Sequence, residues 1–407
     1  MKKYIKNIVP VAALLLTMGT ATSCVGDLDV TPINPNIQTG LNIDGLFNKC
    51  YANFALAGNG GANGDCDIDG IDGGTSGFVR QTFNANELPT DEAICGWGDD
   101  GIAGFCYNSY NASNPMLIGL YARITTGIAY CNQYLAEAGD QDATKLAEIR
   151  FLRAYEYFSL MDGWGNIPFT LQPLTKPERY TRAQVYEWLE KELLEIEPSL
   201  SDAKAKKSTD AGYGRVDKAA CWLLLSRLYL NAEVYTGTPQ WEKAKSYAKK
   251  VMDSSYKLNT KSVNGWSAYQ MLFMGDNGET DAAYEGIFPL LQDGLKTTSW
   301  GTTLFLLAST YDQDMHANPN NPSATNGTDQ AWGGNRARPD LVKKFFPNGN
   351  VPNLESYATA KAAGDDRALF NGVNRSLDND DVATFKSGFG VAKFTNFKTD
   401  GSAVKYA

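Results

Sequence analysis

The chain has a single histidine, His316, among its 407 residues. A Ser–His–Asp triad requires a histidine base beside its other catalytic groups, and a two-histidine metal site requires a second histidine. The sequence also contains no G-x-x-x-x-G-K-S/T phosphate loop and no C-x-x-C pair. We therefore expect no histidine-based catalysis, no zinc site and no phosphate-cradling loop.

Basic residues are outnumbered, with 37 lysines and arginines against 46 aspartates and glutamates, which gives a formal net charge of −9. Such a surface disfavours nucleic acid or another anionic ligand, whereas a neutral ligand fits without electrostatic cost. The hydrophobic fraction of 43% and the charged fraction of 20% are those of a globular protein. The length allows one large domain or two ordinary ones.

The N-terminus resembles an export signal. Residues 1–23 contain three lysines and no acid, then a short apolar run, then small residues before Cys24. The run is too short to cross a bilayer, and the pattern is typical of a secretory signal. Small residues directly before a cysteine also resemble a bacterial lipoprotein cleavage site. We predict a signal peptide over 1–23, a lipid on Cys24, a tether over 24–40 and a folded domain over 41–407. An ordinary signal peptide followed by an incidental cysteine is the alternative.

Cysteine is sparse, with seven residues in the chain. An even number remains if Cys24 carries lipid, and an exported protein can form disulfides. The spacing of the remaining cysteines does not identify pairs, so the pairing stays open. They are Cys50, Cys66, Cys95, Cys106, Cys131 and Cys221.

Apolar residues recur at helical spacing through much of the chain. The pattern predicts helices over 45–57, 115–138, 143–162, 181–200, 217–232 and 240–254, and a short helix over 337–346. Thr181 is the expected N-cap of its helix, and 166–169 is expected to leave the Gly-Trp-Gly turn as extended chain. Residues 80–83 are also expected to be extended. Small residues in 217–232 and 240–254 are typical of tetratricopeptide-like pairs, which bury their faces by stacking.

A glycine-rich segment carries the sequence Asp65-x-Asp67-x-Asp69-Gly70, which is similar to the start of a calcium loop. The twelfth position of such a loop would be Ser76, where an EF-hand requires a bidentate glutamate. An EF-hand is therefore not expected. A looser carboxylate site for structural calcium and the absence of any metal both remain open.

Three tryptophans lie in loops that are rich in glycine: Trp97, Trp300 and Trp332. An indole flanked by glycine is poorly placed for core packing and can present its face to a ligand. Long loops of this kind in a compact domain are commonly functional. For Trp97, the alternative is a ring that folds back onto the protein surface.

Several segments carry sequence motifs that are more specific than the spacing of their apolar residues. The helix E-I-R-F-L-R-A-x-x-Y-F is followed by W-G-x-I-P-F, and further segments read TFNANELPTDEAICGW, GRVDKAACWLLLSRLYLNA, LLQDGLKTTSWGTT and AAGDDRALFNGV. Together they resemble the SusD/RagB family, the surface glycan-binding lipoproteins of Bacteroidetes. The resemblance covers nearly the whole chain. It implies a mainly α fold, in which tetratricopeptide-like helical pairs form a scaffold with long ligand-binding loops.

The resemblance also implies a function and a location. It implies non-catalytic binding of starch or α-1,4-glucan oligosaccharides at the cell surface, with delivery to a SusC-like TonB-dependent transporter. The protein would be held in the outer membrane by the lipid on Cys24 and would face the cell exterior. Asp27 and Asp29, just after that cysteine, are similar to the export signal of such lipoproteins.

The family pattern places the glycan site on five residues of this chain. Trp97 and Trp300 would be stacking platforms, with Trp332 as a third, and Arg80 would donate hydrogen bonds to sugar hydroxyls. Asp100 stands where the family pattern has an amide, and Trp300 stands where it has a tyrosine. A further tryptophan of the pattern is absent near Gly96. No catalytic residue and no metal are implied.

Three alternatives remain beside this interpretation. The same scaffold could bind a different glycan. A surface glycoside hydrolase would need two carboxylates across the scissile bond, and Asp91, Glu92, Asp99 and Asp100 are its candidates. A peptide-binding scaffold fits the helical pairs but leaves the loop tryptophans without a role. The family pattern continues with further helices beyond the end of this chain, so we expect a domain that is incomplete at its C-terminus.

Overall fold

The computed structural model describes residues 41–58, 66–139, 142–321 and 325–404. The predicted signal peptide, the tether with Cys24, and Asp65 lie outside these residues. The chain divides into two units, Met1–Gly45 and Leu46–Ala407. Apart from the start of α2 (Ile43–Ala52), every element below belongs to the second unit.

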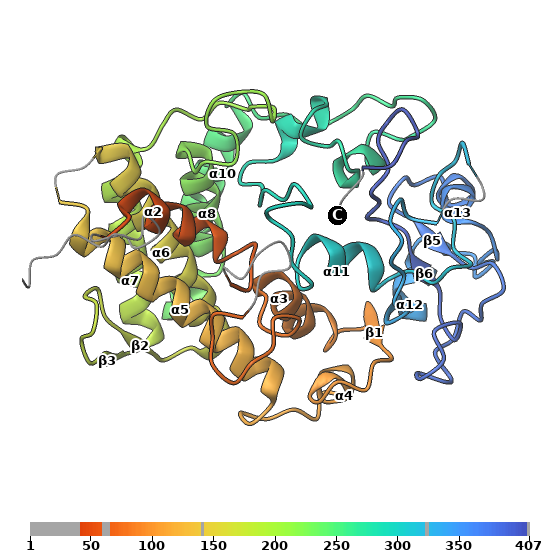
Figure 1. The fold of residues 1–407 in the computed structure, drawn as a ribbon, viewed down its shortest axis with the longest axis horizontal. Coiled ribbons are helices and arrows are strands. Elements are labelled where there is room, and N and C mark those ends of the chain that lie inside the picture. The colour runs from red at the N-terminus through yellow and green to blue at the C-terminus, as the bar shows by residue number, and fades with distance from the viewer. Residues whose placement is uncertain (1–40, 59–65, 140–141, 322–324, 405–407) are drawn as a thin grey trace, which may run out of the picture. The chain divides into compact units, whose positions relative to one another are not determined.

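Paired helices make up the first half of this unit (Figure 1). α5 (Pro115–Glu137) packs on α6 (Ala143–Trp164), α6 packs on α7 (Arg182–Ile196), and α8 (Lys218–Leu230) packs on α10 (Trp241–Met252). Short segments accompany them at α9 (Ala232–Thr236) and in a 3₁₀ turn over Glu197–Ser199. The predicted helical pairs are therefore confirmed, with ends that differ by a few residues.

Local sequence explains where these helices begin and end. The side chain of Asn114 accepts hydrogen bonds from the backbone at the start of α5, and Asp217 does the same for α8. Thr181 and Gln184 form a reciprocal capping box at the start of α7, as predicted from Thr181. α6 ends at Gly165, whose φ of 72° suits glycine. The extended exit follows as β2 (Ile167–Phe169), paired antiparallel with β3 (Glu178–Tyr180).

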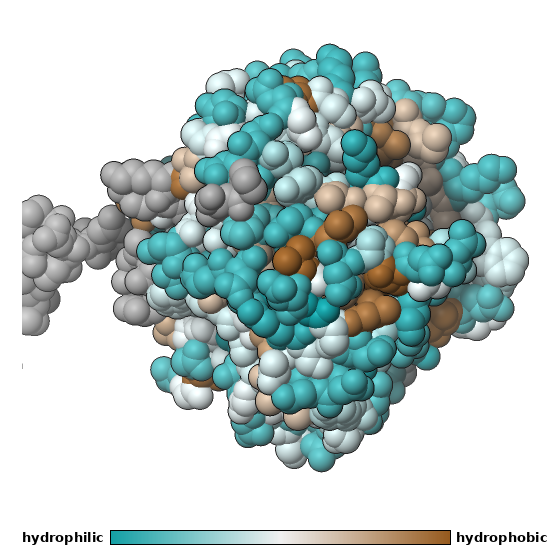
Figure 2. Space-filling view, turned by 90° about the vertical axis from the view of Figure 1, so that its right-hand side faces the viewer, coloured by the Kyte–Doolittle hydropathy of each residue, from teal (hydrophilic) through white to brown (hydrophobic). Residues whose placement is uncertain are grey.

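The second half is built from short elements and long loops. It contains α11 (Thr303–Ala308), α12 (Pro339–Lys344), α13 (Ser356–Ala363) and the antiparallel pair β5 (Phe370–Asn371) and β6 (Gly390–Val391). Two 3₁₀ turns, Gln270–Phe273 and Asp281–Glu285, precede them. Figure 2 shows the face that carries α12 and α13, where hydrophobic residues form separate groups within a mostly hydrophilic surface.

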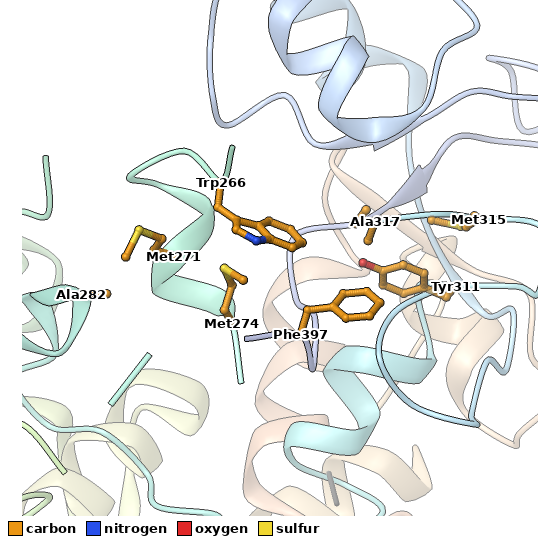
Figure 3. Packing of buried hydrophobic residues seen from close by; sticks show 9 residues of the cluster. Trp266, Met271, Met274, Ala282, Tyr311, Met315, Ala317 and Phe397 are labelled. Atoms are coloured by element: carbon orange, nitrogen blue, oxygen red, sulfur yellow. The ribbon is translucent and has the colours of Figure 1, made fainter. Parts of the chain in front are cut away.

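A buried cluster organises these loops (Figure 3). Trp266 and Phe397 lie in it with ring centroids 6.2 Å apart, although 131 positions of the sequence separate the two residues. The hydroxyl of the fully buried Tyr311 donates a 3.0 Å hydrogen bond to the carbonyl of Phe394. The members are Trp266, Met271, Met274, Ala282, Tyr311, Met315, Ala317, Ala392 and Phe397. Side-chain burial therefore replaces regular secondary structure as the main constraint here.

Two segments join the halves near the predicted site. β1 (Ala93–Cys95) pairs antiparallel with β4 (Asn335–Ala337), in a register that sets Ala93 opposite Ala337 and Cys95 opposite Asn335. α4 (Ile102–Cys106) follows β1, and α3 (Phe78–Glu87) packs on α5. Among the described helices, none combines the length and the apolar character needed to cross a membrane.

The prediction that residues 80–83 are extended is wrong, because they lie inside α3. The buried face of α3 contains the polar side chains of Arg80, Gln81 and Asn84 beside Phe78. An apolar stripe at helical spacing is therefore missing, and the periodicity used to recognise helices fails.

A buried ion pair joins α6 to α7 and generates a stability prediction. Arg153 and Arg150 contact the Glu192 carboxylate at 3.1 and 2.6 Å, and only 6% of Glu192 is exposed. Burial alone would raise the pKa of Glu192, but the hydrogen bonds and charges of the two arginines lower it below the ordinary 4.5. Glu192 therefore stabilises the fold at neutral pH, and this contribution is lost as the pH falls through its folded-state pKa.

We expect Glu192→Gln to lower the free energy of unfolding at pH 7 by about 3 kcal/mol, because the buried Arg153 loses its charge partner and the partly buried Arg150 loses one of two. The difference from wild type should shrink below pH 4.5. Urea unfolding at both pH values measures it. Glu195→Gln is the control, since Glu195 pairs with Arg150 but its side chain is 56% exposed, and we expect a change below about 1 kcal/mol. Equal effects of the two variants would contradict the prediction.

Candidate functional site

Three tryptophans from separate loops lie in one row. The ring centroids of Trp97 and Trp332 are 6.2 Å apart with their planes at 51°, and those of Trp332 and Trp300 are 6.0 Å apart at 44°. Trp332 is thus the middle ring, and each ring is inclined to the next. We call Trp97, Trp332 and Trp300 the tryptophan row. Trp300 is 42% exposed, while the other two are partly buried.

The pairing of β1 with β4 creates the central part of this row. Trp97 follows β1 and Trp332 precedes β4, so antiparallel pairing places the two residues at the same end of the ladder. The ladder is extended there by a 3.1 Å hydrogen bond from the Gly96 amide to the Gly334 carbonyl. Residues 235 positions apart in the sequence thereby become neighbours.

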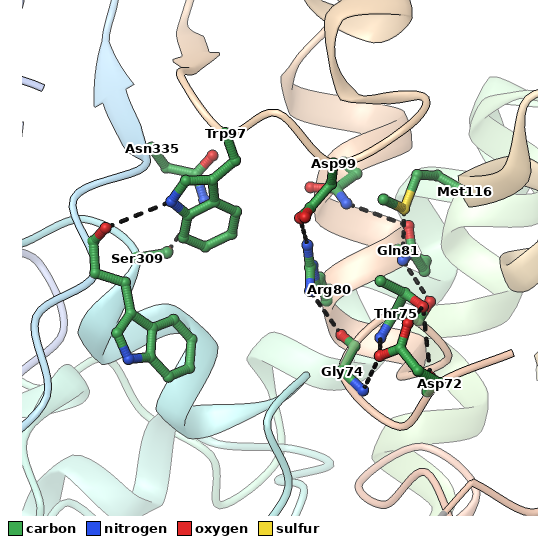
Figure 4. A network of polar contacts seen from close by, with 12 residues as sticks. Asp72, Gly74, Thr75, Arg80, Gln81, Trp97, Asp99, Met116, Ser309 and Asn335 are labelled. Atoms are coloured by element: carbon green, nitrogen blue, oxygen red, sulfur yellow. Dashed lines mark hydrogen bonds and ion pairs between the residues drawn. The ribbon is translucent and has the colours of Figure 1, made fainter. Parts of the chain in front are cut away.

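Hydrogen bonds hold the rings in place (Figure 4). The Trp97 indole nitrogen donates to the backbone carbonyl of Trp332 at 3.4 Å. The Trp332 indole nitrogen donates to Gln330 Oε1 at 3.0 Å, and its backbone amide donates to the Ala308 carbonyl at 2.8 Å. The orientation of these rings is therefore set by protein contacts, without a ligand.

Gly334 gives the Trp97 ring its space. A Cβ atom at position 334 would lie 2.2 Å from the Trp97 ring, a distance that no real contact allows. The Gly334 amide also donates to the Ser309 carbonyl at 2.8 Å, which fixes the backbone. Sequence reasoning did not single out Gly334, although the Trp-Gly-Gly-Asn run signals a close approach of backbone to another group.

Arg80 reaches the row from α3. Its Nη2 contacts Asp99 Oδ2 at 2.5 Å, and its Nη1 donates to the Gly74 carbonyl at 2.8 Å. The guanidinium centre lies 5.2 Å from the centroid of the Trp97 ring and 5.7 Å from that of Phe305. Only 8% of Arg80 is exposed. Both terminal nitrogens thus have protein acceptors already, and the cation supports Trp97 from the protein side.

The loop before α3 is itself rigidly bonded. Asp72 accepts hydrogen bonds from the amides of Gly74 and Thr75 at 2.8 and 3.1 Å. Burial would raise the pKa of Asp72, but its hydrogen bonds with Thr75 and Gly74 lower it. The side-chain amide of Gln81 donates to the Thr75 carbonyl (Figure 4). Together these bonds place the Gly74 carbonyl where it can accept the hydrogen bond from Arg80.

A glycine contact brings Trp300 to the same place. The Arg80 amide donates to the Gly301 carbonyl at 3.0 Å, and a Cβ at Gly77 would lie 3.0 Å from that oxygen. The start of α3 and the loop after Trp300 can approach this closely because neither residue carries a side chain. Arg80, Trp97, Trp300 and Trp332 are thus the four predicted residues that the structure brings together.

The fifth predicted residue, Asp100, does not join this network. It is exposed, and it forms no hydrogen bond or ion pair with any residue that the structure describes. Its neighbour Asp99 instead holds Arg80. Sequence reasoning considered Asp99 only as a hydrolase carboxylate, because nothing in the sequence tells which of two adjacent aspartates faces the arginine.

In the described part of the calcium-like motif, Asp67 forms ion pairs and a hydrogen bond with protein side chains. Asp67 contacts Lys49 Nζ at 2.7 Å and Arg123 Nη1 at 2.9 Å, and it accepts a 2.7 Å hydrogen bond from Tyr130. Burial would raise the pKa of Asp67, but these partners lower it. Within the described residues, no group of three metal-binding side chains is found.

Comparison with known proteins identifies a matching family model and several relatives of the chain. Residues 91–230 match a SusD-like family model described as "Starch-binding associating with outer membrane". The whole chain aligns with the starch-binding protein SusD of Bacteroides thetaiotaomicron at 37% identity, covering 77% of that protein. A solved laminarin-binding SusD-like protein matches with a TM-score of 0.55 at 17% identity, over 88% of this chain and 73% of that one.

A second solved structure, which contains a xylogluco-oligosaccharide, matches with a TM-score of 0.54 at 16% identity, over 74% of this chain and 55% of that one. The chain spans less than half the length of some other solved SusD-like proteins, 44% and 42% in two cases. The likenesses to the laminarin-binding protein and to the structure with the xylogluco-oligosaccharide confirm the expected mainly α, tetratricopeptide-like fold. The 37% identity to SusD over the whole of this chain shows that the chain belongs to the SusD/RagB family.

Proposed function

We propose that this protein binds starch or α-1,4-glucan oligosaccharides without catalysis, and that the tryptophan row is the binding surface. The observation that carries the proposal is the row itself, with three rings inclined successively at 51° and 44°, of which Trp97 and Trp332 are held by hydrogen bonds. The aligned relative is named a starch-binding protein, which supports the choice of ligand.

Sugar chemistry fits such a surface. A pyranose ring has apolar C–H faces and a rim of hydroxyl groups, so aromatic rings meet its faces and polar side chains meet its rim. Three successively inclined rings suit the curved surface of an α-1,4-glucan helix better than a flat chain. At the rim, the exposed carboxylates of Asp99 and Asp100 are acceptors for sugar hydroxyls, and the buried Arg80 holds Asp99 in place.

The preferred glycan has a clear alternative. Solved proteins of the same fold include one named for laminarin binding and one containing a xylogluco-oligosaccharide. The scaffold therefore serves several glycans, and the side chains on its loops decide among them. The inclination of the row favours an α-glucan here.

Hydrolysis is less well supported. Asp99 is engaged with Arg80, and Asp91 and Glu92 precede β1, at the opposite end of the strand from Trp97. Of the four candidates, this leaves Asp100 as the one carboxylate near Trp97 without an ion pair among the described residues, whereas hydrolysis requires two. We therefore propose a binding protein and not an enzyme.

Membership of the family supports a proposal for the location and the partner of the protein. We propose a signal peptide at 1–23, a lipidated tether at 24–40 anchored through Cys24 in the outer membrane, and a glycan-binding domain at 41–407 that faces the cell exterior. A SusC-like TonB-dependent transporter would receive the bound oligosaccharide. We propose no cofactor; structural calcium at the Asp65-x-Asp67-x-Asp69 motif is the alternative, which calorimetry with calcium tests.

The first test compares two tryptophan variants. Titration calorimetry should show that maltoheptaose binds the wild-type protein and that Trp300→Ala weakens binding at least about tenfold, or about 1.4 kcal/mol. Trp241→Ala is the matched control, because Trp241 is 59% exposed but lies on α10. Equal affinity of the two variants would sink the proposal, and binding of a laminarin oligosaccharide alone would favour the alternative glycan.

A second test uses glycine positions. Gly334→Ala should displace the Trp97 ring and weaken maltoheptaose binding several-fold, because the added methyl group collides with the indole. Gly98→Ala is the control, since a Cβ there meets no atom within 4 Å. Circular dichroism confirms that both variants fold. If Gly334→Ala binds as well as Gly98→Ala, the position of Trp97 has no influence on binding.

A third test separates the two aspartates. Asp99→Asn removes the charge partner of Arg80, so the support of Trp97 weakens and affinity should fall several-fold. Asp100→Asn introduces the amide of the family pattern at an exposed position, and affinity should be retained or rise slightly. Calorimetry with maltoheptaose measures both. The reverse order of the two effects would show that Asp100, not Asp99, serves the site.

A further inference from the structure

Two cysteines bracket the segment that carries Trp97 and Asp99. Cys95 is the last residue of β1, and Cys106 is the last residue of α4. The Cys106 sulfur lies 3.4 Å from the Cys95 amide nitrogen and 3.7 Å from the Cys95 carbonyl oxygen. Both side chains are buried in one apolar cluster with Ile94 and Phe105. The segment between Cys95 and Cys106 therefore begins and ends in the same apolar cluster.

A third segment already holds the two ends together. Arg338, just after β4, donates to the Ala93 carbonyl at 2.9 Å and to the Cys106 carbonyl at 2.6 Å. One guanidinium thus binds the backbone carbonyls of Ala93 and Cys106, so the two ends of the segment lie close together.

The cellular route of the family favours oxidation. SusD-like proteins are associated with the outer membrane, so they pass through a compartment in which disulfides form and persist. Cys95 and Cys106 are free thiols in this structure, and the contact of the Cys106 sulfur with the Cys95 backbone makes them neighbours that such a compartment can oxidise.

We propose that Cys95 and Cys106 form a disulfide in the exported protein, and that this bond holds the segment bearing Trp97 and Asp99 in its binding position. The second clause rests on the proposed glycan-binding function, whereas the first does not.

The reaction is thiol–disulfide exchange with a disulfide-bonded oxidant. The thiolate of one cysteine attacks the oxidant and forms a mixed disulfide, which releases one oxidant sulfur as a thiol. The second cysteine thiolate then attacks the mixed disulfide, forms the Cys95–Cys106 bond and releases the other oxidant sulfur. The two cysteines lose two protons and two electrons in total, and the oxidant disulfide gains them as it becomes two thiols.

Burial indicates when this exchange takes place. It raises the pKa of Cys95 to about 12 and the pKa of Cys106 above its ordinary value. Thiolates are the reactive species, so the buried thiols of the folded protein exchange slowly at neutral pH. Exchange is therefore faster in the chain before the cluster closes, and burial limits the access of reductants to the bond once it has formed.

Peptide mapping tests the bond directly. The full chain is exported in a bacterial host, unfolded in an alkylating agent and digested with trypsin without reduction. The peptide 81–123 contains both cysteines, no other cysteine, and no internal lysine or arginine. We expect it to be unalkylated and lighter by two hydrogens than after reduction. Alkylation of both cysteines, or linkage of either to another peptide, would overturn the proposal.

Internal controls come from the same digest. The Cys221 thiol donates to the Leu193 carbonyl at 3.4 Å, so it should be recovered alkylated. The thiols of Cys50 and Cys131 also interact with each other, across α2 and α5, but they lie on other tryptic peptides. A disulfide between them is therefore not confused with the one proposed.

Glycan binding tests the role of the bond. We expect the double variant Cys95→Ala/Cys106→Ala, and wild-type protein refolded in reductant, to bind maltoheptaose several-fold more weakly than Cys221→Ala. If the double variant and the reduced wild-type protein both bind maltoheptaose as tightly as Cys221→Ala, the disulfide has no role in positioning the segment. If the oxidised protein carries the bond but binds no glycan, the proposed function fails and the disulfide stands.

Discussion

The pairing of β1 with β4 is the contact on which the site depends. It joins two short strands more than 200 positions apart and sets Cys95 opposite Asn335. Trp97 and Trp332 meet because they flank this ladder, and Gly334 leaves room for the indole between them. A ladder of only three residue pairs would be marginal in isolation. The helical pairs and the apolar cluster around Ile94 supply the burial that keeps the ladder formed.

The helices of the first half could be predicted from the sequence because their signals are local. Caps such as Asn114 and Thr181, the glycine at position 165 and the apolar spacing between them lie within one stretch of chain. α3 could not be predicted, since its buried face carries Arg80 and Gln81, whose partners lie elsewhere in the fold. The loop-rich second half depends on long-range packing around Trp266 and Tyr311, which no local pattern reports.

The candidate site also combines features that could be predicted from the sequence with features that depend on the folded geometry. Resemblance to a family identified the three tryptophans and Arg80, and the structure places them in contact. The choice of Asp99 over Asp100 depends on which carboxylate faces the guanidinium, a fact of geometry that the sequence does not contain. The proximity of Cys95 and Cys106 could also not be derived from spacing, because it follows from the return of the chain after α4.

Pre-organisation is the central claim of this account: the rings stand in their binding arrangement before the glycan arrives. A crystal structure of the protein with maltoheptaose tests it most directly. We expect the sugar to lie along Trp97, Trp332 and Trp300, with the indole hydrogen bond of Trp97 and the Arg80–Asp99 pair unchanged. A sugar bound elsewhere, or rings that reach it only after Arg80 releases Asp99, would contradict the account.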